Sequence, residues 1–592
     1  MKELEYPFDG DLILASKKSL KRQLLAERQD FLSKKIAILG GGTTAAIRQT
    51  LELFLLQYGI SPSFYESEYN QYYQDACFDN PRLMEFGPDL IYVCTSNRNV
   101  IHYPEMSDSA EQIGEKLRGE YDRFEKIWSC LRETYHCPVI QNNFEMPAYR
   151  LLGNKDASDP HGRVHFLSRL NLLFAEYADS HDNFFLCDIN YISADYGLRE
   201  WSDPFYWYMY KYALNVSAIP LLSFNVANII KSLYGKNQKG LVLDLDNTLW
   251  GGVVGDDGPE HIVIGPEEAE GQAYTEFQEY VRDLSKLGVL LTVDSKNDEE
   301  NALAGLRHPD SVLHPEDFVC VKANWDPKDR NFTQIAQSLN LLPESLVFVD
   351  DNPAERHIIK SAYPGVATPA MEEAHHYIQS IDRAGYFEVT VLSEDDRRRS
   401  EMYKENAQRE QLKSSFSDYR EYLLSLEMKA VIRPFEPVYL DRIAQLTNKS
   451  NQFNLTTKRY TPADIARVAE DPVYLTFYGK LEDRFGDNGV VSILIGRKES
   501  GICHMDLWLM SCRVLKRDME YAMMDALVER CRQESLTEIR GYYYPTAKNK
   551  MVRDFYGDMG FTLLSEDEEG NRTWQFLIDD AYQKKNTVIA IV

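Results

Sequence analysis

The middle of the chain contains four short, continuous apolar runs, and each of them ends in polar side chains. The runs are LVLDL, GVLLTVDS, DFVCV and SLVFVDD, and helix-length segments separate them. Strands that are apolar on both faces are typical of a parallel sheet covered by helices. In an open sheet of this kind, ligands bind outside the carboxyl ends of the strands. The sequence therefore predicts an α/β domain whose chemistry lies along one edge of a parallel sheet.

Another α/β region precedes these runs and opens with KIAILGGGTTAAIRQ, which starts at Lys35. An apolar run, a glycine turn and a helical pattern in this order predict a strand, loop and helix unit. Further apolar runs alternate with helix-like segments, as in a parallel sheet with crossover helices. The apolar stretch from Tyr212 to Ile230 contains several polar residues, which favours a buried helix, interrupted near Pro220, over a membrane span.

The C-terminal part mixes strands such as VVSILIGRKE with helices such as MEYAMMDALVERCRQ, which is typical of an α+β layer. A strongly charged helical segment precedes it and is predicted to link or buttress domains. A chain of 592 residues is long enough for three cores. The predicted organisation is an α/β domain over residues 1–233, a second α/β domain over 234–392, a helical linker over 393–417 and an α+β domain over 418–592.

Composition limits the kinds of partner that the chain can bind. The sequence holds 92 Asp and Glu against 65 Lys and Arg, for a formal net charge of −27. Such a charge repels nucleic acid and anionic lipid, so we expect neither nucleic acid nor a membrane as a partner. The nine cysteines include no CxxC pair, and the first residues lack the apolar core of a signal peptide. We therefore expect a cytoplasmic protein with reduced thiols.

The strongest local signal is the string LVLDLDNTLWGG, in which two carboxylates follow an apolar strand. Later strands end in a hydroxyl, in lysines and in a further carboxylate pair. Carboxylates that share a hard cation with a substrate phosphate are typical of a Mg²⁺ site, and a carboxylate can also attack phosphorus. We expect the four carboxyl side chains to converge around one divalent ion. The predicted magnesium and phosphoryl site consists of Asp244, Asp246, Ser295, Lys296, Asn297, Lys322 or Lys328, Asp350 and Asp351.

The order DxDxT, Ser, Lys and DD resembles the HAD (haloacid dehalogenase-like) phosphatase superfamily. The resemblance implies Mg²⁺ as cofactor, Asp244 as nucleophile and Asp246 as general acid/base. The short interval between Asp246 and the next helix predicts a minimal cap. The implied substrate ligands are Thr248, Ser295, Lys296, Asn297 and Lys328, and the implied metal ligands are Asp244, the backbone carbonyl of Asp246, Asp350 and Asp351.

The longer string LDLDNTLWGGVVGDDG, from Leu243 to Gly258, resembles the FkbH-like family of HAD subfamily IIIC. This resemblance implies a phosphorylated three-carbon substrate, 1,3-bisphosphoglycerate, from which phosphates are removed. It also implies that the glyceryl unit passes to the phosphopantetheine thiol of an acyl carrier protein, for polyketide biosynthesis. Two alternatives remain open: a simple phosphomonoesterase for a small metabolite, and a non-catalytic scaffold that binds the carrier.

The string NKSNQFNLTTKRYT, from Asn448 to Thr461, is similar to a second pattern of that family. Its polar side chains are predicted either to bind the acyl group or the carrier's prosthetic arm, or to satisfy backbone groups of a capped turn. The candidate substrate contacts are Asn451, Asn454, Thr456 and Lys458.

The next segment resembles GNAT acyltransferases, in which a splayed strand end and a helix N-terminus bind the pyrophosphate of coenzyme A. The corresponding turn, from Arg513 to Glu520, contains no glycine, which favours a pantetheine arm or carrier docking over tight coenzyme A binding. A thioester route needs a thiol, and Cys512 beside Arg513 is the candidate, with Cys320 as the rival. A buried structural cysteine is the alternative.

The string LGGGTTAAIRQ resembles the opening of SGNH-type hydrolases, with Thr43 or Thr44 in place of the nucleophilic serine. Asp203 has no His three residues further on, so we expect scaffolding or carrier docking rather than a working triad. The expected fold class is a multidomain α/β protein. It comprises an SGNH-like α/β domain, a HAD-like Rossmannoid parallel-sheet domain with a minimal cap and a GNAT-like α+β domain.

Overall fold

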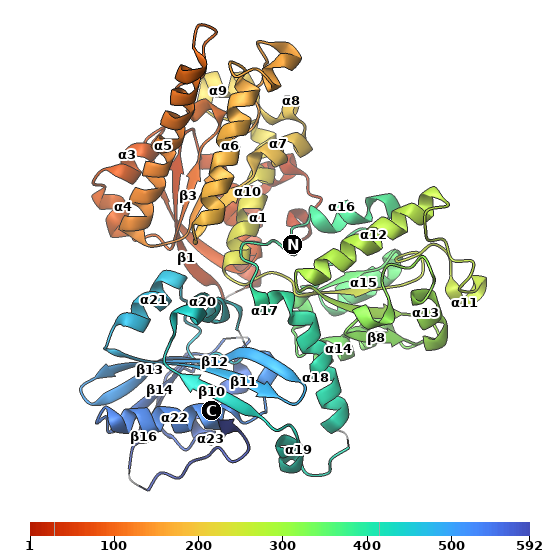
Figure 1. Ribbon diagram of the computed structural model, residues 1–592, viewed down its shortest axis with the longest axis vertical. Coiled ribbons are helices and arrows are strands. Elements are labelled where there is room, and N and C mark those ends of the chain that lie inside the picture. The colour runs from red at the N-terminus through yellow and green to blue at the C-terminus, as the bar shows by residue number, and fades with distance from the viewer. Residues whose placement is uncertain (29, 414, 451, 547, 580) are drawn as a thin grey trace. The chain divides into compact units, whose positions relative to one another are not determined.

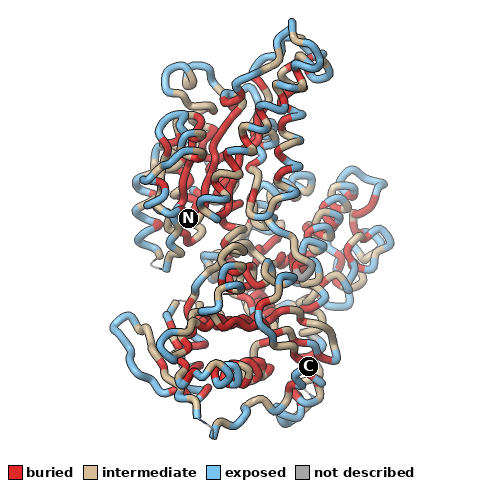
Figure 2. The backbone as a smooth tube through the Cα atoms, turned by 60° about the vertical axis from the view of Figure 1, so that its left-hand side comes forward, coloured by how far each residue is buried: buried red, intermediate tan, exposed pale blue. Residues whose placement is uncertain are grey.

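The structure is a computed structural model of the full chain (Figure 1). It describes every residue except 29, 414, 451, 547 and 580, and for 394, 395, 407, 410, 411 and 512 it describes the backbone alone. The chain divides into two compact units, Met1–Leu233 and Tyr234–Val592. Figure 2 shows buried strands inside both units, with exposed helices and loops around them. The boundaries predicted at residues 392 and 417 lie inside the second unit and stay predictions.

The first unit is built on a five-stranded parallel sheet, in the order β2-β1-β3-β4-β5. The apolar runs of the sequence form these strands because both faces are covered by helices. The parallel sheet with crossover helices was expected, whereas the SGNH-like assignment stays a prediction. The strands are β1 Leu32–Gly40, β2 Ile60–Glu66, β3 Leu90–Cys94, β4 Val139–Asn142 and β5 Phe184–Cys187. The helices are α1 Gly10–Glu27, α2 Ala45–Gln57, α3 Tyr72–Cys77, α4 Pro81–Phe86, α5 Ala110–Tyr135, α6 Arg163–Ser180, α7 Ile189–Tyr196, α8 Leu198–Trp201, α9 Pro204–Tyr210 and α10 Ile219–Leu233.

Helix α10 is the apolar segment that closes the first unit. The predicted interruption near Pro220 is wrong, because the helix begins at Ile219 and places the proline in its first turn, where a missing N–H breaks no helical hydrogen bond. The hydroxyls of Thr50 in α2 and Ser223 in α10 lie 2.6 Å apart. By length and mean hydropathy, 1.4, the window Val216–Leu233 could span a membrane, yet 67% of it is buried inside the protein. Such burial is typical of a core helix.

The second unit contains a four-stranded parallel sheet, in the order β8-β7-β6-β9. Its central strands are buried on both faces, which is why the sequence reads as continuous apolar runs there. The strands are β6 Gly240–Leu243, β7 Leu290–Ser295, β8 Cys320–Ala323 and β9 Leu346–Val349. The helices are α11 Val254–Asp257, α12 Ala269–Lys286, α13 Glu299–Leu306, α14 Lys328–Ser338, α15 Pro353–Ala362 and α16 Tyr377–Asp382.

Gln278 of α12 holds the loop that follows β6. Its amide oxygen accepts hydrogen bonds from the backbone N–H groups of Val312 and Leu313, both at 2.9 Å. Its amide nitrogen donates to the carbonyl of Leu249 at 2.7 Å. One fully buried side chain therefore ties the loop after β6 to a distant turn. This anchor fixes the position of the residues that leave the sheet edge.

The same unit contains an eight-stranded mixed sheet, in the order β15-β16-β14-β13-β12-β11-β10-β17. Strands β13 and β14 are parallel and pair only over Ile502–His504 and Glu538–Arg540, so their later parts diverge. This splayed pair is the feature that the GNAT-like resemblance implies. The strands are β10 Lys429–Arg433, β11 Tyr474–Asp483, β12 Gly486–Glu499, β13 Ile502–Met510, β14 Glu538–Tyr543, β15 Thr562–Glu566, β16 Arg572–Leu577 and β17 Ala590–Ile591. The helices from the linker onward are α17 Glu394–Arg397, α18 Arg399–Lys413, α19 Tyr419–Ser425, α20 Leu440–Lys449, α21 Pro462–Glu470, α22 Met519–Gln533 and α23 Phe555–Asp558.

The charged helix α18 is anchored to this sheet by a buried ion pair. Arg409 donates from two guanidinium nitrogens to the carboxylate of Asp483, at 2.8 and 2.7 Å. Arg517 adds a contact to the same carboxylate at 3.1 Å. A buried carboxylate with two guanidinium partners is satisfied on several sides, and its loss would remove a charged acceptor from two buried arginines. The linker segment therefore buttresses the C-terminal sheet.

The Gln278 anchor predicts a large, local loss of stability on substitution. Gln278→Leu leaves the backbone N–H groups of Val312 and Leu313 and the carbonyl of Leu249 without this partner, at a cost of about 3 kcal/mol or more. Hydrogen exchange at Val312 and Leu313 should accelerate strongly in this variant. Gln272→Leu, an exposed position in the same helix, is the matched control and should leave exchange unchanged. Equal exchange in the two variants would refute the anchor.

Candidate active site

The candidate site lies at the carboxyl ends of neighbouring strands of the four-stranded sheet. Asp244 directly follows β6, and Asp350 and Asp351 directly follow β9. Because parallel strands end at the same edge, residues far apart in the sequence meet there. One carboxylate oxygen from each of the three side chains lies within 4.8 Å of the others. The structure thus brings together three of the four predicted carboxylates.

Lys328 joins two of these carboxylates. It is the first residue of α14, its side chain is 3% exposed, and its Nζ lies 2.9 Å from Asp244 Oδ1 and 2.6 Å from Asp350 Oδ2. Burial lowers the pKa of Lys328, but the two carboxylates together raise it above its ordinary value, so the ammonium stays charged. Of the two candidate lysines, Lys328 occupies the centre of the cluster, and Lys322 lies within β8.

The cluster carries more negative charge than one ammonium neutralises. Burial, followed by the charge of Asp244, raises the pKa of Asp350 to about 6 and raises that of Asp351 above its ordinary value. A bound divalent cation would remove this repulsion. Carboxylate oxygens are the donors that a hard cation such as Mg²⁺ prefers. The donor set therefore fits a magnesium-type ion held by Asp244, Asp350 and Asp351.

The side chain of Asp246 is not among the three carboxylates that lie within 4.8 Å of one another. Its Oδ1 accepts hydrogen bonds from the indole N–H of Trp250 and the backbone N–H of Val254, both at 3.0 Å. Its Oδ2 accepts one from Asn297 at 2.9 Å. The expectation that four carboxyl side chains converge is therefore wrong for Asp246, because the loops after β6 and β7 provide its donors. The metal role predicted for its backbone carbonyl stays a prediction. Burial raises the pKa of Asp246.

The remaining residues predicted around the phosphate occupy different places. Ser295 is buried at the end of β7, and Thr248 accepts a hydrogen bond from the backbone N–H of Asp351 at 3.2 Å. Lys296 forms an ion pair with Glu355 at 2.6 Å. Asn297 orients Asp246, as described above. Thr248 therefore fixes the carboxylate pair, while the contacts of Lys296 and Asn297 are to protein carboxylates.

Two residues of the site were missed by the sequence reasoning. Arg356 donates to the carbonyls of Asp350 and Asp351, at 2.6 and 2.7 Å, and so fixes the backbone that presents both carboxylates. Asn247 adopts a left-handed φ of 55°, and its carbonyl accepts from the hydroxyl of Tyr377 at 2.9 Å. The Asn-Pro pair that opens α15 could have indicated the chain reversal that returns Arg356 to the strand end.

Asp294 is a further buried carboxyl at this edge. It lies within β7, and its Oδ1 accepts a hydrogen bond from the Asn331 amide at 3.2 Å. Burial raises the pKa of Asp294 to about 8, although the charge of Lys328 opposes this shift. Burial thus favours the protonated form of this carboxyl, which limits the negative charge that it adds to the cluster.

A cleft beside Asp351 offers room for a substrate. Its volume is about 930 Å³, which lies in the range typical of small-molecule sites. Arg356 contributes a cation to its wall, while Tyr274 and Tyr377 contribute aromatic rings. Both tyrosine hydroxyls donate to the carbonyl of Asn247, at 3.4 and 2.9 Å, so the wall is connected to the loop after β6. A phosphorylated small molecule in this cleft would lie next to the carboxylates.

The candidate substrate contacts of the C-terminal region are occupied inside the fold. Thr456 donates to the carbonyl of Asp506 at 2.7 Å, and Lys458 pairs with the Asp506 carboxylate at 2.8 Å. Asn454 is buried, and its amide oxygen accepts from the backbone N–H of Thr457 at 2.8 Å. These contacts favour the capped turn over direct substrate contacts. Asn451 lies outside the described residues.

The two candidate thiols are Cys512 and Cys320. Cys512 lies in a short turn, Cys512–Val514, directly after β13, and its side chain lies outside the described part of the chain. The rival Cys320 opens β8, and burial raises its pKa, which disfavours a reactive thiolate there.

In the first unit, the hydroxyls near the glycine turn have protein acceptors. Thr43 donates to the carbonyl of Tyr210, and Thr44 donates to Glu66, both at 2.6 Å. Asn99 donates to the carbonyl of Gly41 at 3.0 Å. The polar side chains therefore stabilise the turn itself.

Comparisons with known proteins give two kinds of match. Residues 35–231 match the family model described as FkbH, N-terminal domain. The chain is also similar to a crystal structure of the N-terminal part of the protein BF1531 from Bacteroides fragilis, which contains a phosphatase domain complexed with Mg. The two chains are 30% identical, the match covers 63% of this chain and 99% of that one, and the TM-score is 0.58. Comparison with curated proteins gives no match.

Acetyltransferase structures match a smaller share of the chain. The ribosomal-protein-S18-alanine N-acetyltransferase from Escherichia coli is 12% identical, with 27% of this chain and 99% of that chain covered and a TM-score of 0.21. Ard1 from Thermoplasma volcanium is 21% identical, with 26% and 99% covered and a TM-score of 0.20. Likeness at these TM-scores supports no conclusion about activity.

The strand order, the carboxylates at the sheet edge and the likeness to a phosphatase-domain structure agree with one another. The second unit thus contains a phosphatase-type domain of the HAD class. The model of the FkbH N-terminal domain matches residues 35–231, which lie in the first unit. The chain belongs to the FkbH-like family.

The carboxylate cluster predicts divalent-cation binding that depends on Asp351. Asp351→Asn removes one negative ligand and should weaken Mn²⁺ binding, measured by isothermal titration calorimetry, by about tenfold or more. Asp256→Asn removes an exposed carboxylate from α11 and should bind Mn²⁺ as the wild type does. Unchanged affinity in Asp351→Asn would contradict the site.

Proposed function

We propose that this chain is a Mg²⁺-dependent phosphatase that couples dephosphorylation to the transfer of a glyceryl unit onto an acyl carrier protein. One observation carries the phosphatase part: three carboxylates lie within 4.8 Å of one another at a sheet edge, with Lys328 between two of them. Family membership supports the transfer part, since 1,3-bisphosphoglycerate and an acyl carrier protein are what the family resemblance implies.

The residues of the edge divide the phosphoryl chemistry between them. Asp244 Oδ attacks phosphorus, and the bond from phosphorus to the leaving oxygen breaks. Asp246 gives its proton to that oxygen and later accepts a proton from the water that hydrolyses the phosphoaspartate, which releases phosphate. The raised pKa of Asp246 suits this alternation, and Trp250 and Asn297 hold its carboxyl in place.

The cation and the neighbouring side chains offset the developing charge. Bound Mg²⁺ supplies positive charge that lowers the repulsion between the phosphoryl group and the carboxylates. Asp244, Asp350 and Asp351 are the residues that hold it. Lys328 keeps Asp244 oriented and offers its ammonium to the phosphoryl oxygens, with Ser295 as a further donor.

The two phosphates of the proposed substrate need different reactions. The acyl phosphate reacts at carbon: a thiolate attacks the carbonyl, the bond to the phosphate oxygen breaks, and a thioester forms. The phosphate ester at the other end reacts at phosphorus, in the HAD-type site. The carrier's phosphopantetheine thiol then attacks the thioester and releases the first thiol. We place the first thiol at Cys512, in the turn after β13.

The alternative is a phosphomonoesterase that acts on a small metabolite without transfer. It is favoured by the compactness of the phosphoryl site, whose described residues come from the strand ends of the four-stranded sheet, the loops that follow them and the adjoining helices. A non-catalytic scaffold has no need for a buried Lys328 between two carboxylates.

Intact-mass spectrometry of the carrier separates these functions. The chain is incubated with 1,3-bisphosphoglycerate, Mg²⁺ and a carrier that bears the phosphopantetheine arm, and phosphate is measured in parallel. Glyceryl-loaded carrier together with phosphate release is the expected result. Asp244→Asn should lower phosphate-ester hydrolysis by about a hundredfold or more, whereas Asp256→Asn should not. Phosphate release without an adduct would support the phosphomonoesterase. If neither product formed, the non-catalytic scaffold would be supported.

The assignment of the first thiol to Cys512 can be tested separately. Cys512→Ser should abolish the glyceryl adduct on the carrier and leave hydrolysis of the phosphate ester within about twofold of wild type, because the two reactions use different groups. Cys320→Ser is the matched control and should retain the adduct. If Cys512→Ser still formed the adduct, another residue would have to supply the first thiol.

A further inference from the structure

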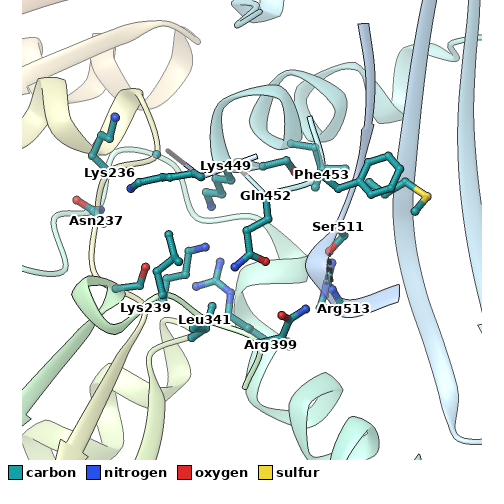
Figure 3. A pocket seen from close by; sticks show the side chains of 18 of the residues that line it. Lys236, Asn237, Lys239, Leu341, Arg399, Lys449, Gln452, Phe453, Ser511 and Arg513 are labelled. Atoms are coloured by element: carbon teal, nitrogen blue, oxygen red, sulfur yellow. Dashed lines mark hydrogen bonds between the residues drawn. The ribbon is translucent and has the colours of Figure 1, made fainter. Parts of the chain in front are cut away.

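A pocket lined by cationic side chains (Figure 3) lies at the edge of the four-stranded sheet opposite to the carboxylate cluster. Its wall includes Lys239, directly before β6, and Leu342 and Ser345, in the turn before β9. The carboxylates follow the other ends of these two strands. Four-residue strands that rise about 3.3 Å per residue separate the two places by about 13 Å or more. The pocket is therefore not part of the phosphatase site.

The charge of this pocket is opposite to that of the chain. The chain has a formal net charge of −27, yet among the lining residues that the structure describes only Glu344 is acidic. Asp396 adds a second carboxylate behind the wall, where it accepts from Lys449 and Arg399. The cations that line the pocket are Lys236, Lys239, Arg399, Arg442, Lys449, Arg513 and Lys548.

Lys449 shows that positive charge is unfavourable in this pocket. Burial, followed by the charge of Arg399, lowers the pKa of Lys449 to about 7, although Asp396 accepts from its ammonium at 2.9 and 3.1 Å. The side chain is still 31% exposed, so solvent and ligand can reach it. An anion in the pocket would favour the charged form of this lysine.

The shape and the neutral groups of the pocket suit phosphate groups. Figure 3 shows Lys239 and Gln452 pointing into the same space from opposite sides. The cavity measures about 150 Å³, room for about five waters of 30 Å³ each, or for one or two phosphate groups with part of their hydration. Arginine side chains bind phosphate oxygens through two parallel N–H groups, and lysines bind them as point charges.

We propose that this pocket binds the diphosphate or bisphosphate group of a small organic molecule, as a second anion site that is separate from the phosphatase site. The lining, with seven cationic side chains and one carboxylate, matches a ligand with several negative charges better than a single phosphate. The limited volume and the net charge of the chain disfavour a nucleic acid. The pocket draws residues from the start of the phosphatase sheet, from α18 and α20, and from the end of β13. A bound ligand would therefore connect the two sheets of the second unit.

Calorimetric titration of the full chain with inorganic pyrophosphate tests the proposal, at fixed ionic strength and with a chelator that removes divalent ions. The wild type should bind pyrophosphate saturably at one site, and inorganic phosphate about tenfold more weakly or less. Lys239→Gln and Arg442→Gln should each weaken pyrophosphate binding by about tenfold. Lys286→Gln, at an exposed lysine of α12, is the control and should bind as the wild type does.

Two further measurements separate this site from the phosphatase site. Asp244→Asn should bind pyrophosphate with unchanged affinity, and Lys239→Gln should hydrolyse a phosphate ester at the wild-type rate, which also shows that the variant is folded. The proposal is overturned if no saturable binding occurs, if Asp244→Asn loses it, or if Lys239→Gln and Arg442→Gln bind as the wild type does.

Discussion

The structure depends on the crowding of Asp244, Asp350 and Asp351 around the ammonium of Lys328. Three carboxylates within 4.8 Å repel one another, and burial adds to the cost of their charge. One lysine that is 3% exposed offsets part of it. A divalent cation can neutralise the remaining negative charge. The cation and Lys328 can then stabilise the charge that develops during phosphoryl transfer. The same arrangement thus explains why the site needs a metal and why it suits phosphate chemistry.

The parallel sheet gives its two edges opposite characters. The carboxyl ends of β6 and β9 present acidic side chains, and the segments before the same strands border the cationic pocket. A strand of four residues is long enough to keep the two charge groups from neutralising one another directly. The acidic edge recruits a metal, and the cationic edge contacts the linker and the C-terminal region. In this way one short sheet serves two different charged ligands.

Much of the phosphatase edge could be predicted from the sequence. Asp244, Asp350 and Lys328 follow or open elements whose apolar runs identify them, and parallel topology then requires that they meet. The side-chain direction of Asp246 could not be predicted, because it depends on donors that the loop supplies only once Trp250 has folded back. The role of Asn454 was equally open, since an amide can bind a ligand or a turn, and only the folded structure shows its backbone partner.

The cationic pocket has no signature in the sequence, because its side chains come from separate segments that share no motif. The metal site, by contrast, consists of Asp244, Asp350 and Asp351, and the position of an ion there can be measured. Anomalous diffraction from crystals soaked in Mn²⁺ gives the position of the ion. We expect one strong anomalous peak between Asp244, Asp350 and Asp351, with the Asp246 side chain outside the coordination sphere. A peak elsewhere, or none at these carboxylates under saturating Mn²⁺, would contradict it.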